Sequence, residues 1–257
     1  MQRLEQKIVV LSGAAGGIGS LVARQLRARG ARVVGVDLAA CPDCDESLRG
    51  DLSTVTGMQE LGQSLAARRV DVLINLAGIQ YFGPFDLQSA ESIALGYSVN
   101  LAAPTVLARA VVPQMKTRGS GQIVNIGSVF GAIPFAHFVT YSAAKAGLRA
   151  LSEGLRRELS GSGVRVTHIA PRAVKTKFNS DRVLQFARLV NMNMDPPELV
   201  AARIVATVGA PVNSVVIGFP ESLFVRINAL APSLVDRALR ANDRKAAAIF
   251  TQAEQAL

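Results

Sequence analysis

The chain has 257 residues, of which 49% are hydrophobic and 18% charged, and its formal net charge is +9. This length suits one or two average domains, and α/β folds of this size often form a single one. The basic residues are dispersed, aromatic residues make up 5%, and tryptophan is absent. This composition argues against a nucleic-acid surface built on base stacking. An acidic carrier protein or a coenzyme A thioester stays open as a partner for the positive charge.

The first residues, MQRLEQKIVVLSG, contain only a strand-length apolar run, so we expect no secretory signal. No uninterrupted apolar stretch approaches the ~20 residues needed to cross a bilayer. We therefore expect a cytoplasmic protein, although a peripheral membrane contact stays open.

A strand, a glycine-rich turn and a helix are predicted at the start of the chain. The run Lys7–Leu11 is apolar, SGAAGGIG follows it, and LVARQLRARG then has helical periodicity. In this context backbone N–H groups and a helix N-terminus cradle a pyrophosphate. The glycine pattern alone is a weak signal, because any tight turn favours glycine.

The next predicted strand, 31–36, ends at Asp37, about twenty positions past the glycines. A carboxylate there is placed to accept hydrogen bonds from adenosine ribose hydroxyls. Cys41 and Cys44 follow in a Cys-x-x-Cys motif, but a structural zinc needs four ligands and there is no second such motif. We favour an ordinary loop, with a redox-sensing dithiol as the alternative.

Further strand-like runs alternate with helical stretches along the chain, which predicts right-handed βαβ units and a parallel sheet covered on both faces. The runs are IVVL, RVVGV, DVLIN, GQIVNIGS, RVTHIA and SVVIGF. Ligands bind such sheets at the carboxyl ends of the strands. Five residues that follow strand-like runs should therefore line one crevice: Gly13, Asp37, Asn75, Ser128 and Pro171.

Tyr141 and Lys145 lie four residues apart in YSAAKAG, thirteen and seventeen residues after Ser128. Positions i and i+4 of a helix share one face. A cation beside a phenol favours the phenolate and lowers the phenol pKa from about 10. The trio thus predicts a proton-transfer site that uses neither histidine nor carboxylate.

Together these motifs resemble the short-chain dehydrogenase/reductase family from about Lys7 to Gly218. The residues that carry the resemblance are SGAAGGIG, Asp37, Asp51-Leu52, Asn75-Leu76-Ala77-Gly78, Asn100, Ser128 and Tyr141-x-x-x-Lys145. The resemblance implies an α/β fold with a single-domain, Rossmann-type, doubly wound parallel sheet. It divides the chain into a catalytic domain, 1–218, and a helical C-terminal extension, 219–257, packed on that domain or at a subunit interface.

The resemblance also implies an oxidoreductase that transfers a hydride between NAD(P)(H) and a secondary alcohol or ketone, with no metal. Tyr141 would exchange the proton on the substrate oxygen, and Ser128 would hydrogen-bond that oxygen. Lys145 would lower the tyrosine pKa and bind the nicotinamide ribose. Asn100, in a helix kink, would hold a relay water.

The cofactor residues that the resemblance implies run the length of the motifs. They are Gly13, Gly17, Ile18, Gly19, Asp37, Asp51, Leu52, Asn75, Ala77, Gly78, Tyr141, Lys145, Pro171, Val174 and Thr176. Two of them have structural alternatives. Asp51 could cap a helix that begins near Ser53, and Asn75 could brace adjacent strands.

We expect NAD(H) rather than NADP(H), which is not excluded. Asp37 would repel a 2′-phosphate, Leu38 stands where NADP enzymes of the family often have arginine, and so does Gly16.

Two positions depart from the family pattern. Leu76 replaces an asparagine, and Arg172 replaces the glycine that usually follows Pro171. For the Arg172 side chain, solvent exposure and a substrate contact both stay open, with solvent favoured.

The segment Lys177–Glu198, which we call the covering loop, should form an apolar lid, because its large apolar residues include Phe178, Val183, Leu184, Phe186, Leu189, Met192 and Met194. After Gly218, apolar residues recur at helical spacing, so 220–239 should be helix with one apolar face buried in the folded assembly. Lid and extension favour a hydrophobic substrate, sterol-like or acyl. The same extension could also contact lipid.

The resemblance further implies a homodimer or homotetramer. A second function class is a non-catalytic nucleotide-binding regulator on this fold. Such proteins typically lose the tyrosine or the lysine, whereas this chain has all four residues implied for catalysis.

Overall fold

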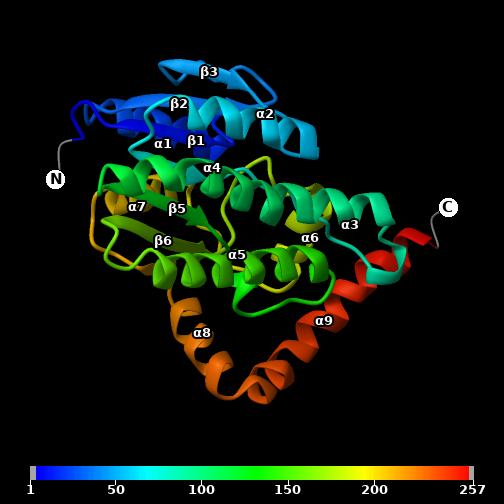
Figure 1. Ribbon diagram of the computed structural model, residues 1–257. Coiled ribbons are helices and arrows are strands. Elements are labelled where there is room, and N and C mark those ends of the chain that lie inside the picture. The colour runs from blue at the N-terminus through cyan, green and yellow to red at the C-terminus, as the bar shows by residue number, and fades with distance from the viewer. Residues whose placement is uncertain (1–3, 255–257) are drawn as a thin grey trace.

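The structure is a computed structural model that describes residues 4–254, with a seven-stranded parallel sheet at its centre (Figure 1). The strand order is β3-β2-β1-β4-β5-β6-β7, so the chain starts in the middle and winds outward in both directions. The strands are β1 Ile8–Ser12, β2 Arg32–Asp37, β3 Glu46–Arg49, β4 Val72–Asn75, β5 Gly121–Ile126, β6 Val164–Pro171 and β7 Ser214–Ile217. The predicted doubly wound α/β fold is confirmed.

Helices cover both faces because the strands are apolar on both faces. In β1, Val9 and Leu11 belong to one core and Val10 to the other. The first core packs against α1 Gly17–Arg27 and α7 Pro197–Thr207. The second packs against α2 Val55–Ala66, α4 Ala103–Thr117 and the C-terminal part of α5 Val139–Glu158.

Strand β3 at the edge of the sheet was missing from the sequence prediction. Its sequence, ESLR, alternates exposed and half-buried residues, and it pairs only with β2. Edge strands lack the buried apolar run by which the central strands are found. The sheet therefore has one strand more than the six apolar runs predicted.

Among the described residues, one helical run, Ala90–Thr117, is long and apolar enough to cross a membrane by length and composition. It consists of α3 Ala90–Tyr97, a π-helical turn Ser98–Ala102 and α4. In α4, Leu107, Val111 and Met115 are fully buried against the sheet. This burial is what a core helix of an α/β sheet requires.

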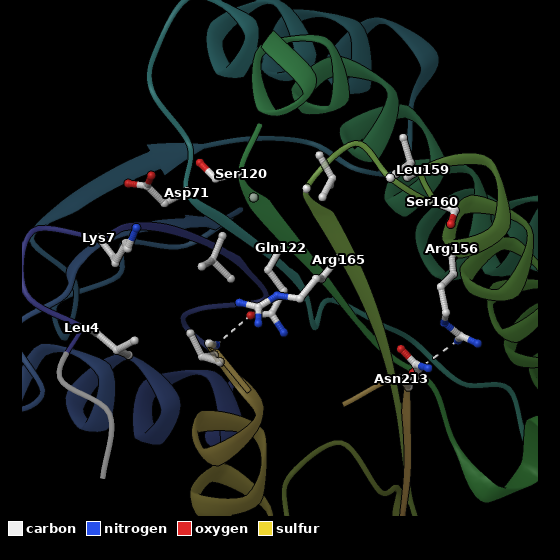
Figure 2. A pocket seen from close by; sticks show the side chains of 17 residues that line it. Leu4, Lys7, Asp71, Ser120, Gln122, Arg156, Leu159, Ser160, Arg165 and Asn213 are labelled. Carbon is white, nitrogen blue, oxygen red and sulfur yellow. Dashed lines mark hydrogen bonds between the residues drawn. The ribbon is translucent and has the colours of Figure 1, made fainter. Parts of the chain in front are cut away.

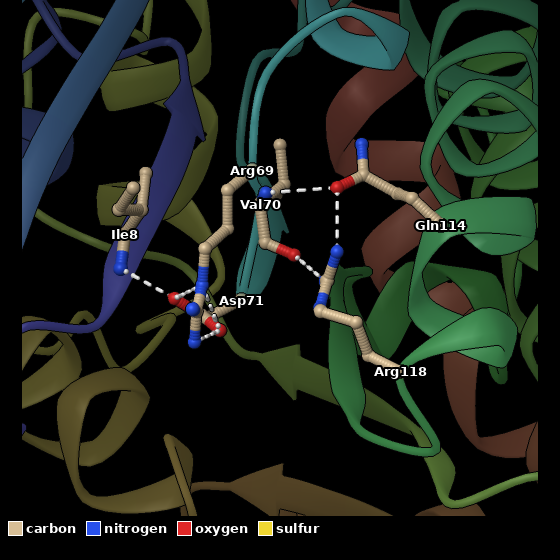
Figure 3. Close-up of polar contacts among 6 residues, drawn as sticks. All are labelled: Ile8, Arg69, Val70, Asp71, Gln114 and Arg118. Atoms are coloured by element: carbon tan, nitrogen blue, oxygen red, sulfur yellow. Dashed lines mark hydrogen bonds and ion pairs between the residues drawn. The ribbon is translucent and has the colours of Figure 1, made fainter.

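Side-chain hydrogen bonds fix the chain where it enters β4 (Figure 3). The Asp71 carboxylate accepts from the Ile8 backbone N–H at 3.0 Å and from the Arg69 guanidinium. The Gln114 amide oxygen accepts from the Val70 N–H at 3.1 Å, and Arg118 donates to the Val70 carbonyl. These contacts set the register of β4 and hence the position of its carboxyl end.

The C-terminal extension forms two helices, α8 Glu221–Leu230 and α9 Pro232–Glu254, which we call the C-terminal arm (Figure 1). The sequence predicted helix here but not the break at Ala231 and Pro232, where proline cannot continue a helix. The far end of α9 packs on α6 Asp181–Leu189, with Ala246, Ile249 and Phe250 buried.

The predicted buried apolar face is exposed in the single chain near the bend of the arm. Leu223 is 46% exposed, Leu230 88% and Leu234 55%. Burial of this face in an assembly stays a prediction.

Candidate active site

One cleft of about 1070 Å³ runs across the carboxyl ends of the strands and collects most of the predicted site residues. The predicted residues that line it are Gly13, Gly17, Ile18, Gly19, Asp37, Asp51, Leu52, Ala77, Gly78, Ser128, Tyr141, Lys145, Pro171, Val174 and Thr176. Asn75 and Asn100 are buried behind its wall. The carboxyl ends of the strands thus bring the lining residues to a single crevice, whereas the expectation that Asn75 lines it is wrong, because this side chain is buried between strands.

A second hollow, of about 710 Å³, lies at the opposite edge of the sheet, where β1, β4, β5 and β6 begin (Figure 2). Lys7, Arg156 and Arg165 give it a basic character. Two of its polar side chains bond to the protein itself: Gln122 accepts from the Gly209 N–H, and Arg156 donates to the Asn213 carbonyl. None of the predicted site residues lines this hollow.

Ser128 and Tyr141 approach each other from two elements. Ser128 follows β5 and caps the short helix Val129–Gly131, where its hydroxyl accepts from the Phe130 N–H at 3.1 Å. Tyr141 is half-buried in the first turn of α5. Burial raises the pKa of Tyr141 to about 12, and a hydrogen bond with Ser128 acts against this rise. The phenol is therefore protonated at neutral pH.

Lys145 lies one turn further along α5 and is 4% exposed. Its ammonium donates to the Ile126 carbonyl at 3.0 Å and lies 5.8 Å from the centre of the Tyr141 ring. Burial lowers the pKa of Lys145 to about 8. Desolvation is the largest cause of the Tyr141 pKa shift. That Lys145 lowers the tyrosine pKa stays a prediction.

Asn100 lies in the π-helical turn Ser98–Ala102, which is the kink that the sequence led us to expect. Its amide donates to the carbonyls of Ile79, at 2.8 Å, and Gly96, at 2.9 Å. A Cβ at Gly78 would lie 2.9 Å from the Asn100 Oδ1 and 3.5 Å from the Lys145 Nζ. Gly78 thus leaves open the space between amide and ammonium.

The glycine turn packs against the strand next to it. Gly13 has φ +72°, and a Cβ there would lie 2.8 Å from the Ala77 backbone. The helix α1 then begins at Gly17 with no side-chain cap. Its first N–H groups face the cleft with the positive end of the helix dipole, which favours an anionic ligand.

Two carboxylates lie at the far end of the cleft. Asp37 ends β2, and its oxygens accept from the N–H groups of Ala15, at 3.1 Å, and Ala39, at 3.3 Å. Asp51 accepts from the Ser53 hydroxyl and N–H, which lowers the Asp51 pKa. The alternative of a helix cap at Asp51 is wrong, because Thr54 caps α2.

Asn75 braces adjacent strands, as its structural alternative predicted. Its amide donates to the Asn125 side-chain oxygen at 2.8 Å, and Asn125 donates to the Ser152 hydroxyl of α5 at 2.9 Å. Ser12 on β1 accepts from the N–H groups of Leu76 and Ala77. These bonds tie β1, β4, β5 and α5 together under the cleft.

The segment after β6 closes the cleft on its other side. Thr176 faces the start of α1, because its Cγ2 would lie 3.5 Å from a Cβ at Gly17. The expectation that the Arg172 side chain faces solvent is wrong, because this side chain is only 18% exposed. It forms ion pairs with Asp195 at 2.6 Å and Glu221 at 3.0 Å.

Several cleft residues were not predicted from the sequence. Gln80 donates to the Phe178 carbonyl and the Asn179 side chain, which ties the segment after β4 to the covering loop. Leu95, Val99 and Phe130 add apolar lining. Nothing in the sequence distinguished these side chains from ordinary surface or core residues, since each depends on contacts between distant segments.

Cys41 and Cys44 are free thiols packed over Gly35. Burial raises the pKa of both thiols, that of Cys44 to about 12. Reactive cysteines have lowered pKa values, so the structure favours the ordinary-loop interpretation of the Cys-x-x-Cys motif.

His168 on β6 packs beneath Gly127 and is 4% exposed. Burial, reinforced by the cations of Arg149 and Lys145, lowers its pKa from 6.5 to about 4. The unfolded chain therefore binds a proton between these pH values that the folded chain does not. We expect the free energy of unfolding to fall by on the order of 3 kcal/mol from this residue as pH drops from 6.5 to 4.

Urea unfolding of wild type and His168→Gln at pH values from 4 to 7 measures this contribution. The difference in free energy of unfolding between the two proteins should change with pH only between about pH 4 and 6.5. Parallel profiles would mean that His168 is not buried in its neutral form.

The residues fit a nicotinamide dinucleotide. The cleft extends from the carboxylates of Asp37 and Asp51, past the uncapped start of α1, to Tyr141 and Lys145. Ribose, pyrophosphate and nicotinamide would meet these three regions in turn, and Asp37 keeps acceptor capacity toward the cleft.

Comparisons with known proteins agree with this geometry. The family model described as short chain dehydrogenase matches residues 7–185. The ketoacyl reductase HetN of Nostoc sp. is 31% identical in an alignment that covers 93% of this chain and 90% of HetN.

Two solved structures place a cofactor on a similar fold. The short-chain dehydrogenase of Sphingobium yanoikuyae in complex with NADPH is 27% identical, with a TM-score of 0.75 over 90% of this chain and 95% of its own. The 4-hydroxyisoleucine dehydrogenase complexed with NADH is 25% identical, with a TM-score of 0.73 over 82% and 96%. Both forms of the cofactor thus occur on this fold.

Proposed function

The chain belongs to the short-chain dehydrogenase family, and we propose that it transfers a hydride between NAD(H) and a hydrophobic secondary alcohol or ketone. Its relatives are named dehydrogenases and reductases, and the chain is an oxidoreductase of CH–OH or C=O groups that uses NAD(P). The proposal adds the choice of NAD, the class of substrate and the role of Tyr141 as the acid/base.

One observation carries the proposal: Ser128, Tyr141 and Lys145 converge in the cleft that also contains the uncapped start of α1. With a pKa near 12, the phenol is a proton donor at neutral pH. When bound, the reduced cofactor supplies the hydride. Tyr141 then gives its proton to the carbonyl oxygen as negative charge develops there, and Ser128 hydrogen-bonds the same oxygen.

The buried Lys145 stabilises the phenolate that this transfer leaves. Because its pKa is about 8, the Lys145 amine can both lose and regain a proton near neutral pH. Asn100 and the space left by Gly78 lie beside it, and we propose that a water held there carries the replacement proton inward. The reverse reaction, alcohol oxidation, needs the phenolate and is therefore expected to speed up as pH rises.

The substrate end of the cleft supports a hydrophobic substrate. Its lining there is apolar, with Leu95, Val99, Phe130, Phe138, Phe178, Val183 and Met192. The name of the relative HetN, a ketoacyl reductase, supports the acyl alternative over the sterol-like one.

A substrate panel tests the proposal. Purified protein is incubated with long-chain 3-ketoacyl thioesters, sterol ketones and short polar ketones, with NADH or NADPH, and the absorbance of the reduced cofactor is followed. We expect the highest kcat/KM on an apolar substrate with NADH. Turnover confined to polar polyols or sugars would overturn the substrate class.

We also propose that a second copy of the chain covers the exposed face of the C-terminal arm. Leu223, Leu230 and Leu234 would otherwise leave an apolar patch that soluble monomers rarely keep. A self-complementary contact between two copies would bury this apolar patch on both copies at once. None of these three leucines lines the cleft.

Sedimentation of wild type, Leu230→Glu and Val55→Glu measures this assembly. Val55 is 68% exposed on α2 and serves as the matched control. We expect a dimer or tetramer for wild type and the control, and dissociation for Leu230→Glu. A monomeric wild type that binds anionic vesicles would instead favour the lipid contact.

A further inference from the structure

Arg172 occupies a position where three segments meet. It follows Pro171 at the end of β6, lines the cleft, and projects its guanidinium away toward the covering loop and the C-terminal arm. The guanidinium donates to the Asp195 carboxylate at 2.6 Å, the Glu221 carboxylate at 3.0 Å and the Phe219 carbonyl at 3.2 Å. One side chain thus bonds to both the end of the covering loop and the start of α8.

The backbone around Arg172 is built for this contact. Gly218 has φ +113°, and a Cβ there would lie 2.7 Å from the Arg172 Cδ. The arginine stem therefore lies directly on the Gly218 backbone. Asp195 is held by the same segment, since its N–H donates to the Ala173 carbonyl and its carbonyl accepts from the Lys175 N–H. The base of the covering loop is closed by this short parallel bridge.

The opposite side of the covering loop is held by the arm itself. Phe186 of α6 is 1% exposed and belongs to the cluster that includes Ala246 and Ile249 of α9. Between these two attachments, Phe178, Val183 and Met192 line the cleft. Any movement of the arm relative to β6 would therefore move the apolar wall of the cleft.

We infer that Arg172 is a positioning residue that clamps the covering loop to the C-terminal arm and so fixes the width of the apolar end of the cleft. The inference rests on the proposed function in that this end receives the substrate. Arginine suits the task because its planar fork bonds three acceptors at once, which a lysine ammonium on a flexible stem does less well.

The burial of the clamp makes it sensitive to the loss of one partner. The side chains of Arg172 and Asp195 are 18% and 7% exposed. The Arg172 Nε and the Asp195 Oδ2 have no hydrogen-bond partner among the described residues. Breaking a buried ion pair from one side leaves an uncompensated charge, which costs more than the pair itself contributes.

The experiment compares Arg172→Lys and Glu221→Gln with wild type, and uses Arg226→Gln as the control. Arg226 is exposed on α8. Glu221→Gln removes one charge while keeping size, so it leaves the fold intact even if Arg172→Lys does not. Limited trypsin digestion of the full-length protein, read by mass spectrometry, reports cleavage at Lys177, Arg182 and Arg188 in the covering loop.

We expect both test variants to be cleaved in the covering loop about tenfold faster. This factor corresponds to a loss of ~1.4 kcal/mol in the free energy that holds the loop closed. KM for a bulky apolar substrate should rise by a similar factor, while kcat, and KM for a short ketone, stay near wild type. A merely structural role for Arg172 would change both substrates together. Arg226→Gln should match wild type throughout.

Unchanged cleavage in both test variants would overturn the clamp. Equal changes of KM for bulky and short substrates would also overturn it. The digestion does not depend on turnover, so faster loop cleavage in a protein that reduces no ketone would leave the clamp standing and refute the proposed function instead.

Discussion

Replacing Tyr141 with phenylalanine will lower kcat by about 10³-fold, within the range that a positioned general acid contributes. Phenylalanine keeps the ring, and the neighbouring Lys145 keeps its hydrogen bond to the Ile126 carbonyl. What the variant loses is the hydroxyl that bonds Ser128 and carries the transferable proton. The glycine turn and the start of α1 are untouched, so NADH should bind with an affinity close to that of wild type.

Tyr97→Phe is the matched control, because Tyr97 is exposed on α3 and does not line the cleft. Stopped-flow or steady-state rates with a verified substrate, together with NADH fluorescence titration, measure the two effects separately. A Tyr141→Phe enzyme with near-native kcat would refute the assigned proton donor.

Ser128→Ala tests whether the two hydroxyls act as a unit. Residues that act on one transition-state oxygen have effects that do not add. The double variant Ser128→Ala/Tyr141→Phe should therefore lose little more activity than Tyr141→Phe alone. Additive losses would instead assign the two side chains to separate steps.

The sequence predicted the centre of the sheet well because central strands are apolar on both faces. Val9, Val10 and Leu11 form an unbroken apolar run, and runs of this kind make β1, β4 and β5 recognisable from the order of residues alone. Strand β3 has only the half-buried pattern of ESLR and could not be found in this way. Its pairing depends on β2 beside it, which a local pattern does not contain.

The site divides in the same manner. Residues at strand ends, such as Ser128, could be placed because parallel topology brings all carboxyl ends to one edge. The Tyr141 pKa could not be predicted, because the desolvation that raises it depends on how deeply the folded chain buries the phenol. The side chain of Arg172 was misassigned for a similar reason, since its partners Asp195 and Glu221 are 23 and 49 residues away.

In the C-terminal arm, the periodicity of apolar residues predicts helix but not which part of the helix is buried. Helical spacing correctly indicated helix after Gly218, but the buried end of α9 depends on Phe250, which packs on Phe82 with ring centres 5.1 Å apart. Aromatic contacts between segments so far apart leave no trace in a local pattern.

Asp37 should make the enzyme prefer NAD(H) by about 10²-fold in kcat/KM. Asp37 ends β2 at the cleft, where the adenosine ribose would lie, and its carboxylate already accepts from the Ala15 N–H at 3.1 Å. A 2′-phosphate brought within about 5 Å of this charge would be repelled by roughly 3 kcal/mol per unit charge at an effective dielectric constant of about 20. A ribose hydroxyl would instead donate a hydrogen bond to it.

Asp37→Asn and Asp37→Ala separate the charge from the hydrogen bonds. Asparagine removes the charge but keeps an acceptor for the Ala15 N–H, so the preference should fall mainly through a gain with NADPH. Alanine also loses the acceptor that holds the glycine turn, so kcat/KM with NADH should fall further in Asp37→Ala. Asp86→Asn, an exposed site outside the cleft, controls for the change in net charge. A wild-type enzyme that prefers NADPH would refute this assignment. Equal kcat/KM values for the two Asp37 variants, with NADH and with NADPH, would mean that the bond to Ala15 plays no part in cofactor binding.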